Sequence, residues 1–515
     1  MTTYKNKIKE LSRELIWSHA VESLTTSREA SRVLNKNYLK KLWRYAFDDN
    51  ILKYKVKSDC NDRYFHDWLS FSDIVYGHKK AEEIKVAFFC GPEPENDVNH
   101  LLELGVRIEN IYAFESDKDT FKDATESLKE NHPTLKIYNG KIENFVSSNF
   151  VTFDIIYLDF TGSLLTVFKT ICAIFDNNAL SSLGILAVNT CYPDATDENI
   201  EFLATYFHYQ SCFEYPVYFG REEGEDYSGR YIESSTCYGY SYTKTKELVT
   251  ANFEEAYSAF QTSFIINYSN HIKPFMAVLN NAVTRLRLFN SDKSILKNTV
   301  KEFFNRGGGE IYWEPEHYAL YHFFENISNP KWVQFFNEEK GKESFARRDA
   351  VNLLYTFLNA QYEDFEIVLS NDLREALPKI YDNIPDRIYP GLFCDVPMIH
   401  LWLEQAINQL GYAYHINTSN HKRYYYTAKE RQMCLDIFTF DQCRALYDWL
   451  PMIEYYGEDL SIIERQIISR MCMDAIDKQT LHILDTQYYG AALIGINERS
   501  WSENYHFEDR IHIED

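Results

Sequence analysis

Five short polar segments in the first half of the chain each follow an apolar run, and they carry residue types that chemistry needs. The segments are residues 91–96, Glu115, residues 139–142, residues 159–163 and residues 189–192. A carboxylate in such a place can orient or deprotonate a substrate group, which is the role we predict for Asp159, with Thr161 beside it. A second carboxylate, Glu115, is suited to accept hydrogen bonds from hydroxyl groups. We expect a site wherever the fold brings these segments together.

The apolar runs before these segments have the length and composition of buried strands. Strands are predicted over residues 84–90, 111–114, 134–138, 153–160 and 185–190, with helices over residues 95–104, 118–130, 163–175 and 198–209. Asp117 is the predicted cap of the second helix. Two tyrosine-rich runs, 213–219 and 236–243, are expected to close the sheet as an antiparallel pair. This alternation specifies an α/β fold with a Rossmann-like parallel sheet, helices on both faces and a ligand crevice at the carboxyl ends of the strands.

The order and spacing of these segments resemble motifs one to five of the class I S-adenosylmethionine-dependent methyltransferases. The matching stretches are VAFFCGPEPEND, IYAFESD, IYNGKIENF, FDIIYLDFTGS and GILAVNTC. The resemblance implies a transferase with S-adenosyl-L-methionine as its cofactor. The residues that it assigns to the cofactor are Cys90, Gly91 and Glu93 at the methionine end, Glu115 at the ribose, and Gly140 and Ile142 at the adenine. At the methyl acceptor it places Asp159 and Thr161.

The sequence departs from that family in two places. The first loop has a single glycine, Gly91, followed by Pro-Glu-Pro-Glu, so it is stiff and anionic. Its carboxylates disfavour a phosphate-bearing dinucleotide and tolerate a sulfonium cation. Lys141 stands where the family commonly has an acid that accepts the adenine amino group, and Glu143 is an alternative acceptor there. These departures favour a second hypothesis, a catalytically degenerate methyltransferase-like scaffold that binds a partner protein or a nucleotide within a complex.

Structural roles are open for the same residues. Glu115 and Asp159 could each cap the helix that follows instead of contacting a ligand. Cys191, just after the fifth strand, is a candidate nucleophile or a buried thiol. The absence of a Pro-Cys context favours the buried thiol.

The formal net charge of −23 is unevenly distributed. Residues 1–57 hold thirteen basic and six acidic residues, a charge of +7, which leaves −30 for the rest. Residues 412–431, predicted as a hairpin with its turn at 417–420, add a local +3, and the tyrosines at 424–426 can stack on bases. An acidic body repels phosphate backbones, so RNA or DNA would be bound by the basic head and this hairpin. The alternatives are two docked amphipathic helices in the head and an edge hairpin with solvated charges.

Length and composition indicate a folded chain of several domains. We predict a basic helical extension (1–79), a methyltransferase-like α/β domain (80–247), a helical connector (248–309) and a mainly helical C-terminal domain (310–515). No apolar run is long enough to span a membrane, and the ten cysteines stand singly, without a zinc motif or a disulfide framework. We therefore expect a cytoplasmic protein that binds no membrane and no metal. A protein partner and a homo-oligomer both remain open.

Overall fold

One mixed sheet joins the strand-forming segments of the chain. The computed structural model describes residues 7–34, 36–37, 40, 62–210, 242–289, 292–305, 323–324, 326–337, 347–359, 370, 411–428, 430–448 and 509–514. In these ranges nine strands pair in the order β3-β2-β1-β4-β5-β8-β7-β9, with β6 paired to β8. Their bounds are β1 Val86–Phe89, β2 Ile111–Glu115, β3 Lys136–Asn139, β4 Phe153–Asp159, β5 Leu180–Cys191, β6 His415–Ile416, β7 Lys422–Ala428, β8 Arg431–Asp441 and β9 Ile511–His512.

Strands β1 to β5 are parallel, and β8 reverses the direction. β1 lies between β2 and β4, so the strand order changes direction beside it. The pairing of β5 with β8 is antiparallel and runs from Leu183↔Asp441 to Cys191↔Met433. β7 is antiparallel to β8 and therefore runs the same way as β5, and β9 is parallel to β7.

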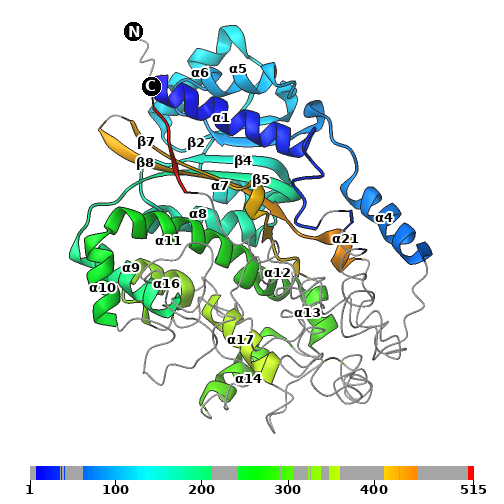
Figure 1. Cartoon of the computed structure of the whole chain (residues 1–515), viewed down its shortest axis with the longest axis vertical. Coiled ribbons are helices and arrows are strands. Elements are labelled where there is room, and N and C mark those ends of the chain that lie inside the picture. Colours follow the sequence, from blue (N-terminus) through cyan, green and yellow to red (C-terminus); the bar gives the residue numbers. More distant parts are fainter. Residues whose placement is uncertain are drawn as a thin grey trace.

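Helices cover both faces of the sheet (Figure 1). On one face lie α1 (Lys7–Leu24), α5 (Glu95–Glu103) and α6 (Lys118–Asn131), and on the other lie α7 (Ile142–Ser148), α8 (Leu164–Asp176) and α11 (Phe253–Asn267). The other described helices are α4 Asp62–Tyr76, α9 Asp197–Gln210, α10 Tyr242–Ala251, α12 Lys273–Asn280, α13 Ala282–Leu288, α14 Lys293–Asn305, α16 Pro330–Asn337, α17 Arg347–Asn359 and α21 Arg444–Tyr447. A π-helical turn, Tyr268–Ile272, joins α11 to α12, and 3₁₀ turns span Ala81–Glu83, Ile108–Asn110 and Thr418–Asn420.

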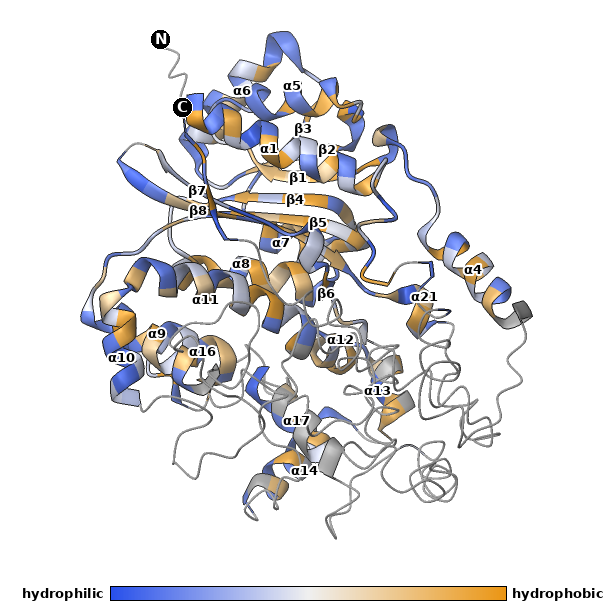
Figure 2. Cartoon of the chain, viewed as in Figure 1, coloured by the Kyte–Doolittle hydropathy of each residue, from blue (hydrophilic) through white to orange (hydrophobic). Residues whose placement is uncertain are grey.

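The central strands are apolar on both sides because both faces are covered. In β4, Ile155 and Tyr157 belong to the core beneath α1, whereas Ile156 and Leu158 belong to the core beside α8. Figure 2 shows hydrophobic residues along these strands and along α8. Successive side chains of a strand face opposite sides of the sheet, so this alternation decides which side chains at the strand ends point toward α1.

The predicted strand and helix order over residues 84–210 is confirmed. Asp117 caps α6, with its Oδ1 accepting from the backbone N–H of Thr120 at 2.9 Å. β5 begins at Leu180, earlier than predicted, and α7 follows β3 where the sequence predicts no helix. The α/β class is thus present, with a sheet that is mostly parallel and partly antiparallel.

The closing antiparallel pair differs from the prediction. The run 213–219 lies outside the described residues, and of the run 236–243 only Tyr242 and Thr243 are described, at the start of a helix. The strands that close the sheet are instead β8 and β7, which come from the second half of the chain. The sheet therefore crosses the boundaries predicted at 248 and 310.

The hairpin predicted around residues 417–420 is not formed, although a turn is present there. Residues 418–420 form a 3₁₀ turn between β6 and β7, and both of these strands pair with β8. The hairpin turn lies between Ala428 and Arg431, where Glu430 has a φ of +64°. The aromatic run 424–426 is therefore an inner part of the sheet.

Candidate functional site

The predicted site segments lie along one edge of the sheet, at the carboxyl ends of β1 to β5. Glu115 pairs with Asn139 on β3, and Asp159 pairs with Asn189 on β5. Parallel strands that are paired in register end at the same edge, so the sequence-distant segments become neighbours.

The loop after β1 combines a buried thiol with open backbone. The N–H of Cys90 donates to the carbonyl of Phe114 at 3.2 Å, and burial, followed by the charge of Glu115, raises the pKa of the Cys90 thiol to about 12. Gly91 has a φ of +58°, and a Cβ added there would meet no atom within 4 Å. Glu93 is exposed and accepts from Asn96 Nδ2 at 3.1 Å. The backbone at Gly91 is therefore open to a ligand.

One of the two carboxylate oxygens of Glu115 is hydrogen-bonded within the protein. Its Oε1 accepts from the N–H of Asp117 at 2.8 Å and so supports the turn before α6, although Asp117 itself is the cap. None of the described residues donates a hydrogen bond to its Oε2. Gly140, whose N–H donates to the Glu115 carbonyl at 2.8 Å, also has open space where a Cβ would be. Glu115 and Gly140 thus form a continuous edge after β2 and β3.

Ile142 does not present its side chain at this edge. It is 0% exposed and belongs to the core beside α7 and α8. Lys141 is exposed and precedes α7 without capping it. Glu143, the alternative acceptor for an adenine amino group, accepts from Thr170 Oγ1 at 2.5 Å instead. The Ile142 side chain is therefore out of reach of an adenine, and one carboxylate oxygen of Glu143 is occupied by Thr170.

Asp159 ends β4 and is held from two directions. Its Oδ1 accepts from Asn189 Nδ2 at 2.7 Å, and its Oδ2 lies 3.6 Å from Lys9 Nζ on α1. The predicted alternative role as a helix cap is wrong, because Ser163 occupies the N-cap position of α8 and no described N–H of that helix donates to Asp159. The Asp159 carboxylate therefore does not stabilise the start of the helix that follows it.

Thr161 and Cys191 lie at the same strand ends. Thr161 is exposed, and its carbonyl accepts from Cys191 Sγ and from Arg431 Nη1, each at 3.3 Å. Cys191 is 7% exposed and also lies 3.5 Å from Met433 Sδ. The buried-thiol interpretation of Cys191 is therefore confirmed.

The basic head, residues 1–57, includes α1, an amphipathic helix that packs on the sheet. In α1, Trp17 donates through Nε1 to Asp97 Oδ1 at 2.9 Å, and Arg13 Nε lies 3.3 Å from Asp97 Oδ2. The ring of Trp17 meets Phe88 and Tyr157 edge-on. Burial raises the pKa of Asp97, and Arg13 and Trp17 oppose that effect. The second amphipathic helix predicted for the head falls mostly outside the described residues.

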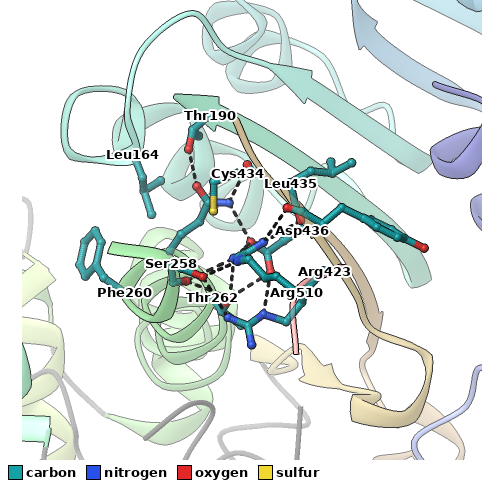
Figure 3. Close-up of polar contacts among 12 residues, drawn as sticks. Leu164, Thr190, Ser258, Phe260, Thr262, Arg423, Cys434, Leu435, Asp436 and Arg510 are labelled. Atoms are coloured by element: carbon teal, nitrogen blue, oxygen red, sulfur yellow. Dashed lines mark hydrogen bonds and ion pairs between the residues drawn. The ribbon is translucent and has the colours of Figure 1, made fainter. Parts of the chain in front are cut away.

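The basic hairpin is largely internal. Arg423 is 7% exposed and Tyr426 is 1% exposed, so neither can meet a phosphate or a base at the surface. Figure 3 shows Arg423 and Arg510 converging on Asp436 between β8 and α11, with Arg510 Nη2 2.6 Å from Asp436 Oδ2 and Arg423 Nε 3.7 Å from Asp436 Oδ1. The prediction that this hairpin offers Arg423 and Tyr426 to nucleic acid is wrong, while Arg431 remains exposed beside Thr161.

Three residues of the site carry no role predicted from the sequence. Asn189 lies near the end of β5, in register with Asp159 on β4, and it comes directly after an apolar run in the sequence, which is a usable signal. Lys9 and Tyr426 lie at the site because α1 and β7 pack there. The local sequence pattern does not predict such long-range packing.

Comparison with protein families, with curated proteins and with solved structures found no match. Over the residues that the structure describes, no helix is both long and apolar enough to cross a membrane.

Proposed function

We propose that this protein is an S-adenosylmethionine-dependent methyltransferase that acts on RNA, DNA or a nucleic-acid-like substrate. One observation carries the proposal: Glu115 on β2 and Asp159 on β4 flank the end of β1, where Gly91 leaves open space. The change of strand order beside β1 is where ligands bind in open α/β sheets.

The residues at this edge fit the cofactor in part. Glu115 Oε2 is available to ribose hydroxyls, and the open backbone at Gly91 and Gly140 permits close approach. Ile142 can offer only its backbone, because its side chain is fully buried. When bound, S-adenosylmethionine supplies an electrophilic methyl group on a sulfonium cation, which the carboxylates of Glu93, Glu115 and Asp159 would tolerate.

At the acceptor, Asp159 is proposed to hold and, where needed, deprotonate the substrate group, with Thr161 at the rim. The antiparallel pair β7–β8 beside five parallel strands supports a Rossmann-like interpretation. The described cysteines are all free thiols, which supports a cytoplasmic location.

A second candidate is a methyltransferase-like scaffold without catalysis. It is favoured by the ion pair of Lys9 with Asp159, which occupies the acceptor carboxylate, by the burial of the Ile142 side chain, and by the hydrogen bond from Thr170 to Glu143. Such a scaffold would bind a partner protein or a nucleotide at the same edge.

Calorimetric titration of S-adenosylmethionine tests the proposal. Micromolar binding, about −8 kcal/mol, is expected for the native protein. Glu115→Ala should weaken it by about tenfold or more, since hydrogen bonds to a charged group contribute roughly 1.5–3 kcal/mol. Glu130→Ala, at an exposed position on α6, is the matched control. Absence of binding at millimolar ligand would leave the scaffold as the better description. Transfer of labelled methyl groups to total RNA, DNA and protein then identifies the acceptor class.

A further inference from the structure

The last described residues of the chain, 509–514, add a short strand to the edge of the sheet. β9 is parallel to β7, with His512 paired to Tyr425, and the N–H of Ile513 donates to the Tyr425 carbonyl at 3.0 Å. The strand has two residues, which is short for a strand in a sheet. Side chains must therefore supply most of the interaction that holds this segment.

Three side chains of the segment contact the protein in different places. Ile513 is 6% exposed and belongs to the core beneath α1, whereas Arg510 enters between β8 and α11 (Figure 3). The ring of His512 stacks on that of Tyr425, with centroids 4.6 Å apart. A peptide added to a sheet edge is recognised in this way, because main-chain pairing gives affinity and the contacts of alternate side chains give specificity.

The guanidinium of Arg510 uses all three of its nitrogens. Nη2 lies 2.6 Å from Asp436 Oδ2 and donates to Thr262 Oγ1 at 3.2 Å. Nη1 donates to the Leu435 carbonyl at 2.8 Å, and Nε donates to Ser258 Oγ. The Arg510 side chain is 7% exposed and that of Asp436 is 0% exposed. These acceptors match a planar fork of donors, which the compact ammonium of a lysine cannot reproduce.

The carboxylate that receives Arg510 also ends a buried chain of hydrogen bonds. Gln261 Nε2 donates to Asp436 Oδ2 at 2.7 Å. A carboxylate only accepts, so this contact fixes the amide of Gln261, whose Oε1 accepts from Thr190 Oγ1. Gln261 and Thr190 are both 0% exposed, so a hydrogen bond broken here is not replaced by one to bulk water.

The same chain of hydrogen bonds continues to the start of α8. Thr190 donates to Gln261, so it accepts from Tyr257 Oη, which lies 2.7 Å away. Tyr257 Oη in turn accepts from the backbone N–H of Leu164 at 2.8 Å. Leu164 is the first residue of α8 and directly follows residues 159–163 of the candidate site. A continuous set of hydrogen bonds therefore joins the C-terminal strand to the loop that ends this site.

We infer that the pocket at Asp436 is a binding site for an extended peptide that carries an arginine and, three residues later, an aliphatic side chain. Residues 509–514 of this chain are its ligand, and their binding holds the start of α8 in place. Without Arg510, the carboxylate keeps its contacts with Arg423 and His421, which lie at Oδ1. It then turns toward them and away from Gln261, and the hydrogen bonds that lead to α8 lose their fixed order. This role of the segment does not depend on the binding of S-adenosylmethionine.

The first test supplies the segment as a separate peptide. A fluorescent peptide of residues 507–515 is titrated into the full-length Arg510→Ala protein, and binding is followed by anisotropy. Micromolar binding is expected. The peptide changes Arg510→Lys and Ile513→Ser should each weaken it by about tenfold or more, and the exposed Asp509→Ala should not.

The native protein should bind the same peptide at least about tenfold more weakly, because its own segment is covalently attached and fills the site at a high effective concentration. If Arg510→Ala does not fold, the full-length Ile513→Ser protein receives the peptide instead, since it loses the other anchor of the segment.

The second test follows the start of α8 by hydrogen exchange and mass spectrometry. In the full-length Arg510→Lys and Thr190→Val proteins, the amide of Leu164 should lose about tenfold or more of its protection. Tyr76→Phe is the matched control. It removes a hydrogen bond to Asp441, another buried carboxylate of β8, and should leave the protection of Leu164 unchanged.

The two tests can each overturn the inference. Failure of the native peptide to bind the variant protein, or equal affinity of the Arg510→Lys peptide, would show that the pocket does not recognise the segment. Unchanged protection of Leu164 in Arg510→Lys, or an equal loss in Tyr76→Phe, would show that the segment does not hold the start of α8.

Discussion

Lys9 Nζ lies 3.6 Å from Asp159 Oδ2, which ties the first turn of α1 to the carboxyl end of β4. The basic head and the acidic body thus meet at the strand end where we place the methyl acceptor. The pair is partly exposed, so it stabilises the fold little and can open without a large cost.

Reversing the charge of Lys9 is expected to lower stability slightly. Lys9→Glu places a like charge beside Asp159, and the free energy of unfolding should fall by about 1 kcal/mol or less, with a smaller effect at high salt. Lys7→Glu, two residues earlier and exposed, is the control. Urea unfolding measures both. Equal effects of the two substitutions would show that the Lys9–Asp159 contact contributes nothing.

Alanine substitutions at two glycines of matched geometry distinguish the effect of backbone strain from the effect of a lost ligand contact. Gly91 and Gly77 both have a φ of +58°, and a Cβ added at either would meet no atom within 4 Å. Alanine at either site should cost about 1 kcal/mol of stability, because an L side chain is disfavoured at positive φ. Only Gly91→Ala should weaken the binding of S-adenosylmethionine in calorimetry. Unchanged affinity in Gly91→Ala would mean that the ligand does not approach this backbone.

The part of the fold that sequence can predict is the part with local signals. Strands β1, β2, β4 and β5 contain an apolar run followed by a polar segment, and α6 has a recognisable cap in Asp117. The pairing of β8 with β5 is a long-range contact without a local signal. Its aromatic neighbour β7 has the sequence pattern of an edge hairpin, although Tyr426 is buried.

The candidate site divides in the same way. Glu115 and Asp159 can be predicted because a carboxylate that ends an apolar run is visible in sequence. Ile142, predicted to lie at the adenine, has its side chain in the core, and the sequence does not show that α7 turns it there. Tyr426 and Lys9 depend on how distant elements pack, so no spacing rule could assign them.

Arg510 anchors the C-terminal strand through a buried charge. Arg510 Nη2 lies 2.6 Å from Asp436 Oδ2, and Nη1 donates to the Leu435 carbonyl at 2.8 Å. Arg510→Ala should lower the free energy of unfolding by roughly 3–5 kcal/mol, because it removes one partner of a buried ion pair. Asp509→Ala, at an exposed neighbour, is the control. A loss below about 1 kcal/mol would show that Arg423 alone can compensate Asp436.

The same network sets a response to acid. Burial would raise the pKa of Asp436, but Arg510, His421 and Arg423 outweigh it and hold that pKa far below its ordinary value. A carboxyl group whose pKa is lower in the folded chain than in the unfolded chain stabilises the fold at pH values above its unfolded pKa, about 4. This contribution is lost as the pH falls further. Asp436→Asn should flatten the loss of stability below pH 4 in urea unfolding. If the variant loses as much stability below pH 4 as the native protein, other carboxyl groups cause that loss.

Lys273 should make stability rise with pH on the alkaline side. It is 0% exposed and donates to the carbonyls of Gly411 and Tyr412, and burial lowers its pKa to about 7. Between pH 7 and about 10 the unfolded chain binds a proton at this lysine that the folded chain does not, so the free energy of unfolding should increase by on the order of 1 kcal/mol per pH unit. Lys273→Met should remove this slope, whereas Lys301→Met, at an exposed position on α14, should keep it. Urea unfolding at several pH values from 6.5 to 9.5 measures all three proteins. A native protein whose stability is flat over that range would show that Lys273 stays charged in the fold, held by the two carbonyls and by the ring of Tyr414 at 4.9 Å.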